Sequence, residues 1–157
     1  MQKEQIQEFT SKIALSNRTG LTVVTYEILF AYLLDAKSAL KEERFSDYKQ
    51  ALRQAQRCIS ELMVTLDFSY ELANELYRIY AYGKELLAKA MYKRSEEEIA
   101  ECESLLKMLH ASFVEVAKTD RSAPLMQNTQ QVYAGYTYGR NDVNSSSDEN
   151  PSRGFFV

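Results

Sequence analysis

The chain is poor in the residue types that most often carry enzyme chemistry. Its 157 residues include one histidine, two cysteines and no tryptophan. The single histidine, His110, allows no Cys–His or Ser–His relay beyond one pair that the fold would have to assemble. Glycine-rich phosphate loops and nucleophile-elbow motifs are also missing from the sequence. We therefore expect a protein that is not an enzyme and that uses no cofactor.

The residues that could bind a metal lack the spacing of a metal site. Cys58 and Cys102 both fall on apolar helical stripes, which indicates free thiols in a reducing compartment. Glu103, Lys107 and His110 share one helical face, but a lysine stands where a metal-binding bundle requires a carboxylate. We expect no metal.

The charge and the hydropathy disfavour two further classes of partner. The formal net charge is -3, so there is no broad positive field to attract nucleic acid or anionic lipid. No apolar run approaches the ~20 residues of a spanning helix, and the longest one, residues 21–36, contains Glu27 and Asp35. The first ten residues are polar and do not resemble a secretory leader. We expect a cytoplasmic protein that neither binds nucleic acid nor inserts into a membrane.

Proline is missing from residues 1–118, and glycine occurs there only at Gly20 and Gly83. Apolar residues recur at alternating spacings of three and four, which is typical of helices with one buried face. The pattern predicts a helical body at residues 1–118, with a short helix at about 2–15 and four main helices at 20–42, 46–66, 69–93 and 95–118. Thr19 and Ser46 are suitable N-caps for the first two main helices. Because the junctions are short, successive helices should run antiparallel. The predicted fold is all-α, an antiparallel up-down four-helix bundle with a short extra N-terminal helix and a polar C-terminal arm.

The composition changes in residues 119–157, which we expect to form a flexible or docked tail. Residues 141–154 are polar and of low complexity, which is typical of a segment without its own core. Aromatic residues bracket this segment, and they are candidates for docking: Tyr133, Tyr136, Tyr138, Phe155 and Phe156. The tail could cover the apolar surface of the bundle in the empty state, or it could be a nonspecific or partner-binding arm.

Two helices carry more apolar surface than one buried face requires. In residues 20–42, one line runs through Leu21, Val24 and Ile28, and a second runs through Tyr26 and Phe30. The helix at 69–93 likewise has a second stripe beside its main seam. Such stripes are either wide shoulders of the core or a groove for an incoming helix. Tyrosine suits a groove because its ring supplies contact area while its hydroxyl tolerates water.

The junction of the second and third main helices resembles the FliS family of flagellar export chaperones. The resemblance is carried by ISELMVTLDF, residues 59–68, and LANELYRIYAY, residues 72–82. Tyr26, Glu27 and Ala36 upstream and Leu109 and Phe113 downstream fit the spacing of the same family, so the resemblance covers roughly residues 19–118.

The resemblance implies a cytosolic chaperone that binds the disordered C-terminal segment of flagellin. Binding would prevent premature polymerisation and present flagellin to the flagellar type III export gate. Combined with the apolar stripes, it makes seven residues candidates for client binding: Val23, Tyr26, Phe30, Leu33, Tyr77, Tyr80 and Leu87. The protein would be a monomer or a weak homodimer. Two alternatives are a phosphotransfer bundle that uses His110 and a helical adaptor for another client.

Overall fold

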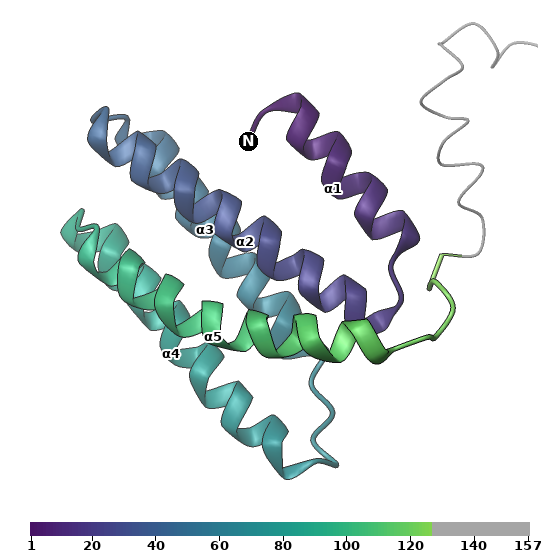
Figure 1. The fold of residues 1–157 in the computed structure, drawn as a ribbon. Helices are drawn as coiled ribbons and strands as arrows, with labels where there is room; N and C mark the ends of the chain where they lie inside the picture. The colour runs from purple at the N-terminus through teal and green to yellow at the C-terminus, as the bar shows by residue number, and fades with distance from the viewer. Residues whose placement is uncertain (127–157) are drawn as a thin grey trace, which may run out of the picture. The chain divides into compact units, whose positions relative to one another are not determined.

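The computed structural model describes residues 1–126, which contain five α-helices and no strand. These are α1 (Lys3–Leu15), α2 (Arg18–Lys41), α3 (Phe45–Val64), α4 (Glu71–Lys93) and α5 (Glu97–Thr119), shown in Figure 1. The all-helical class predicted from the spacing of apolar residues is confirmed.

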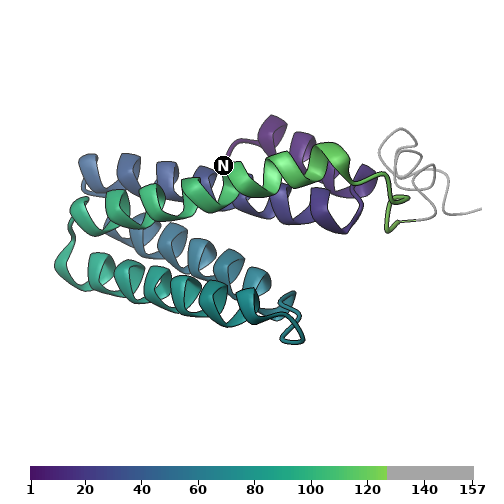
Figure 2. The same cartoon turned by 60° about the horizontal axis from the view of Figure 1, so that its bottom comes forward.

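The main core lies among α2, α3, α4 and α5. Within the described chain, α3 contacts α2 and α4, and α5 contacts the same two helices (Figure 2). Each of the four contributes large, fully buried side chains. These include Leu29, Leu33, Tyr48, Leu52, Ile59, Leu62, Leu87, Ile99 and Leu106. Their burial, at about 1.5–3 kcal/mol per large side chain, offsets much of the entropy of ordering the helices.

The first turn of α2 is capped by a different residue from the one expected. The Asn17 side-chain oxygen accepts the Gly20 N–H at 2.8 Å, so Asn17 and not Thr19 is the N-cap. The Thr19 hydroxyl instead donates to the carboxylate of Asp120 just after α5. Ser46 also lies inside its helix, since α3 begins at Phe45.

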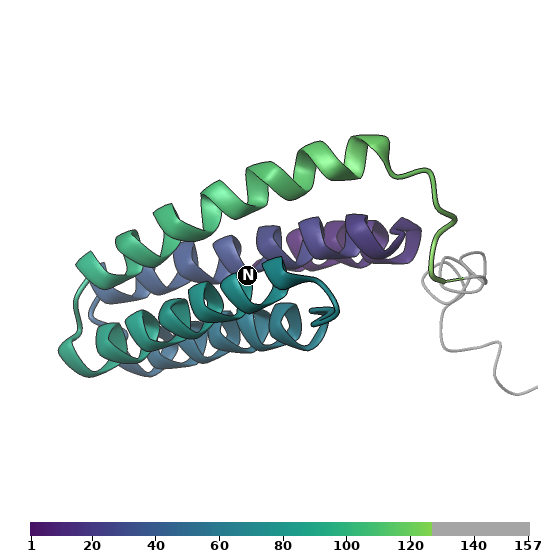
Figure 3. The same cartoon turned by 90° about the horizontal axis from the view of Figure 1, so that it is seen from below.

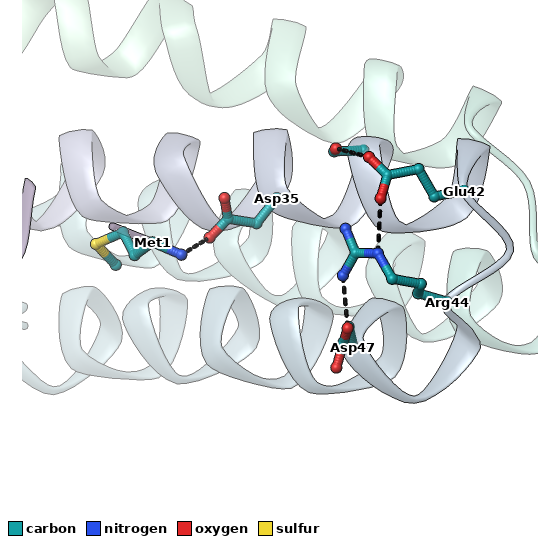
Figure 4. A network of polar contacts seen from close by, with 6 residues as sticks. Met1, Asp35, Glu42, Arg44 and Asp47 are labelled. Carbon is teal, nitrogen blue, oxygen red and sulfur yellow. Dashed lines mark hydrogen bonds and ion pairs between the residues drawn. The ribbon is translucent and has the colours of Figure 1, made fainter. Parts of the chain in front are cut away.

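Of the described helices, α1 contacts only α2. Phe9 of α1 packs with Val24 and Ala31 of α2 in a second small apolar cluster. Polar contacts fix the two ends of this pair: Lys12 binds Glu27 at 2.9 Å, and the α-amine of Met1 binds Asp35 at 2.6 Å (Figure 4). One of the two apolar lines on α2 is therefore covered by α1.

By length and composition alone, α2 could cross a membrane. Core helices pass the same test, and α2 here contacts α1, α3 and α5. Its apolarity is explained by this threefold cover, as expected for a helix buried on more than one side.

Helices α4 and α5 lie close together only over part of their length. Near the middle of α4, the Tyr82 hydroxyl donates to Glu101 at 2.6 Å, and Gly83 lies against Cys102. Toward the start of α4 and the end of α5, the two helices diverge (Figures 1 and 3). The apolar seams of both helices continue into this diverging region.

Candidate functional site

An open apolar groove of about 480 Å³ lies where α4 and α5 diverge. Its lining comes from the start of α2, the α3–α4 junction, the first turns of α4 and the end of α5. The apolar lining residues are Leu66, Leu72, Ala73, Leu76, Tyr80, Phe113 and Val116. The groove is a hollow in the bundle end with apolar walls on two helices.

Large apolar side chains around this groove are exposed to solvent. Leu72 on α4 is 61% exposed, and Val116 on α5 is 54% exposed. In the α3–α4 junction, Tyr70 is exposed, and Phe68 meets the ring of Tyr77 edge-on at 6.0 Å between centroids. Clustered exposed apolar surface is typical of a site that binds another chain.

The floor of the groove is an aromatic cluster that includes the lining residues Tyr80 and Phe113. The hydroxyls of Tyr26 and Tyr80 are 2.6 Å apart and share a hydrogen bond. Phe113 and His110 of α5 pack against Tyr26, each with 5.8 Å between ring centroids. Burial raises the pKa of both tyrosines above the usual value of 10.0, which further disfavours the charged form of either hydroxyl. The two tyrosine hydroxyls are therefore uncharged and paired with each other.

Polar groups line one rim of the groove. Arg18, Thr19 and Thr22 line it from the first turn of α2, and Asp67 lines it from the α3–α4 junction. Hydrogen bonds from the hydroxyl and the backbone N–H of Ser69 lower the pKa of Asp67, with a smaller contribution from the charge of Arg18. The rim thus carries one fixed carboxylate and one guanidinium beside apolar walls.

Four of the seven residues expected to bind a client lie in the core instead. Tyr26, Leu33 and Leu87 have no exposed surface, and Tyr80 is 1% exposed. While the helices keep this packing, these four side chains are core residues without surface for a client, and their part in client binding stays a prediction. Only Tyr80 also lines the groove, as part of its floor.

The other three candidates keep some exposure. Val23 and Phe30 on α2 are half-buried, and Phe30 packs edge-on against His110. Tyr77 is 46% exposed beside Phe68 but does not line the groove. The five aromatic tail candidates, Tyr133 to Phe156, lie outside the described residues.

The residues that line the groove were expected in the core from the sequence. Leu66, Leu72, Leu76, Phe113 and Val116 all continue the regular apolar seams of their helices. Periodicity shows which face of a helix is apolar, but it does not show where two helices diverge. A seam that continues past the point of contact looks the same in sequence as one that is buried.

His110 is not placed as an accessible phosphorylation site. Its Nε2 atom is buried without a hydrogen-bond partner, and the ring packs against both Phe30 and Tyr26. An aqueous phosphate donor could not reach that nitrogen without repacking the aromatic cluster. Among residues 1–126, no group of three potential ligand side chains is placed to hold a metal ion.

A comparison with curated proteins finds no match for the chain. The family model described as "Flagellar protein FliS" matches residues 1–120, which include all five helices and the whole groove. The chain therefore belongs to the FliS family of flagellar export chaperones.

Proposed function

We propose that this protein binds the disordered C-terminal segment of flagellin in the cytoplasm, prevents its premature polymerisation and delivers it to the flagellar type III export apparatus. Membership of a family of flagellar chaperones supports the general role. The observation that carries the specific proposal is the open apolar groove between α4 and α5. We infer that α2 to α5 form an antiparallel four-helix bundle and that the groove lies at one end of it. The contacts of α3 and α5 with both α2 and α4 support this arrangement.

The groove suits an amphipathic helix as its occupant. Leu72 and Leu76 stand one turn apart on α4, Phe113 and Val116 stand about one turn apart on α5, and all four line the same hollow. A client helix with apolar residues at spacings of three and four would place them between these two walls. Each large side chain buried there contributes about 1.5–3 kcal/mol, and part of this is spent on ordering the client.

The test is calorimetric titration of the full chain with a peptide spanning the C-terminal helices of flagellin. We expect one-to-one binding with a negative heat-capacity change and a gain in helix signal, since disordered apolar segments bury surface as they fold. In Leu72→Glu/Val116→Glu, both changed residues are exposed, so the fold should persist. The affinity should fall by at least about tenfold, because two charges would line the apolar walls.

A matched control places the same charges elsewhere. Leu34 on α2 and Met108 on α5 are 66% and 68% exposed and lie outside the groove. Leu34→Glu/Met108→Glu should bind the peptide as the unchanged protein does. Equal losses in both variants would show that the groove is not the principal binding site, and an absence of binding by the unchanged chain would reject flagellin as the client.

A further inference from the structure

The outer face of α3 and α4 carries a second surface, away from the groove. Lys49, Arg53 and Arg57 are exposed and follow one another at intervals of four residues along α3. At about 1.5 Å of rise per residue, they form a line of positive charge about 12 Å long. On the neighbouring helix, the ring of Tyr92 is 91% exposed beside the half-buried Met91. These five residues are called the α3–α4 basic face.

The three cations of this face form no ion pair with a carboxylate of residues 1–126. Seven of the 17 lysine and arginine side chains between residues 1 and 126 form ion pairs, and Lys49, Arg53 and Arg57 are among the ten that form none. Two adjoining hollows of about 360 and 340 Å³ share Lys49 and Arg53, and neither is lined by a carboxylate. The whole chain has a net charge of -3, so the charge of this basic line is opposite in sign to the net charge of the protein.

The helices under this face are fixed to each other. The Gln56 side chain donates to the backbone oxygen of Lys84 at 3.1 Å, and the Lys84 ammonium donates to the hydroxyl of Ser60 at 2.9 Å. These bonds join α3 to α4, and Gln56 also lines one of the two hollows. A partner would thus meet a surface whose backbone is already ordered, which lowers the entropic cost of binding.

We propose that the α3–α4 basic face is a docking surface for an acidic amphipathic helix of a second protein. Carboxylates spaced one turn apart on such a helix match the spacing of Lys49, Arg53 and Arg57, and the arginines can pair with them through two hydrogen bonds each. Tyr92 and Met91 supply an apolar flank for one hydrophobic residue of the partner. The three charges are few for binding a phosphate backbone, and the net negative charge of the chain opposes both nucleic acid and anionic lipid.

The test measures fluorescence anisotropy of labelled peptides with the full chain. The probe is a helix-forming peptide with glutamate at every fourth position and a leucine stripe beside the glutamates. Its counterpart carries lysine at the glutamate positions. We expect saturable binding of the acidic peptide alone, weakened by added salt because exposed ion pairs are screened.

Charge reversal locates the binding site on the protein. Arg53→Glu/Arg57→Glu should weaken binding of the acidic peptide by at least about tenfold. Lys41→Glu/Arg78→Glu is the control, since it changes the net charge equally at exposed residues and should leave the affinity nearly unchanged. Tyr92→Ala should lower the affinity without altering its salt dependence. Far-UV circular dichroism would verify that each variant is folded.

Four results would overturn the proposal. The first is that the acidic peptide does not bind saturably, and the second is that both charge-reversal variants lose affinity equally. The third is that single-stranded DNA or phosphatidylserine vesicles bind more tightly than the peptide. The fourth is self-association that disappears in Arg53→Glu/Arg57→Glu, which would assign the face to a second copy of the chain. None of these outcomes depends on whether the groove binds flagellin.

Discussion

The hydroxyl pair of Tyr26 and Tyr80 is the main polar feature of the core. Both side chains are buried, and each hydroxyl has the other as its partner at 2.6 Å. In a low-dielectric interior, a lone hydroxyl is costly, whereas a paired one is nearly neutral. The pair also joins α2 to α4, so it supports the floor of the groove.

We predict that Tyr80→Phe lowers the free energy of unfolding by about 1–3 kcal/mol, because it leaves the Tyr26 hydroxyl buried without a partner. Tyr26→Phe/Tyr80→Phe should be less destabilising than the sum of the two single changes, since no hydroxyl is then left unpaired. Urea denaturation of the four proteins gives the coupling directly. Additive losses would show that the two hydroxyls are not coupled in solution.

A second residue-scale prediction concerns Glu98 at the start of α5. Its carboxylate accepts a hydrogen bond from Lys93 at 2.7 Å, which, with help from Ser95, lowers its pKa from 4.5 to about 2. A carboxyl whose pKa is lower in the folded state stabilises the fold above its unfolded pKa. That contribution is complete above about pH 4.5 and is lost as the pH falls toward about 2.

We expect Glu98→Gln to remove this part of the pH dependence. Chemical denaturation at several pH values between about 6 and 2.5 should give a shallower loss of stability in the variant than in the unchanged chain. The pKa of Asp120 is also lowered to about 2, by Ser122 and Thr19. Asp120 should therefore still contribute to the pH dependence of stability in the variant. Parallel curves for the two proteins would show that the Lys93–Glu98 contact does not persist in solution.

At the scale of elements, α4 combines a regular helix with an internal glycine. Gly83 is buried in the middle of α4, next to Ile59 of α3 and Cys102 of α5. A methyl group added there would lie 3.5 Å from Ile59 Cδ1 and 3.6 Å from Cys102 Sγ, which are ordinary contacts. The glycine is therefore not required by space or by backbone conformation.

We predict that Gly83→Ala stabilises the protein by about 0.5–1 kcal/mol, because alanine costs less backbone entropy in a helix. Gly20→Ala is the comparison, since its methyl would lie 3.1 Å from the Asn17 oxygen that caps α2. The second variant should gain less or lose stability. Thermal unfolding of both variants measures this difference, and a loss of stability in Gly83→Ala would mean that the α3–α4–α5 contact is tighter than the structure has it.

At the scale of the whole molecule, the groove and the α3–α4 basic face have no lining residue in common. Along α4, Leu76 in the groove and Tyr92 on the basic face are about 24 Å apart at 1.5 Å of rise per residue. Two partners could therefore bind without touching the same side chains.

We predict that a saturating flagellin peptide changes the affinity for the acidic peptide by less than about twofold, since separate sites without a shared moving element are not coupled. A titration of the preformed complex with the labelled acidic peptide measures this. Direct competition would show that both peptides use one surface.

The amino-acid sequence alone determined the helical class and the family of the protein. The lack of proline through residues 1–118 and the regular apolar spacing are local properties. They therefore favour helices independently of how those helices pack together. The motif at residues 59–82 was sufficient to indicate the FliS family, which the match over residues 1–120 confirms.

Only the tertiary structure decided which apolar stripes are buried. Tyr26 and Tyr80 fall on secondary stripes, yet they are enclosed, because α2 is covered on three sides and their hydroxyls pair. Leu72 and Val116 continue main seams, yet they are exposed, because α4 and α5 diverge at that end. Burial depends on the distance between helices, and the periodicity of one helix holds no information about that distance.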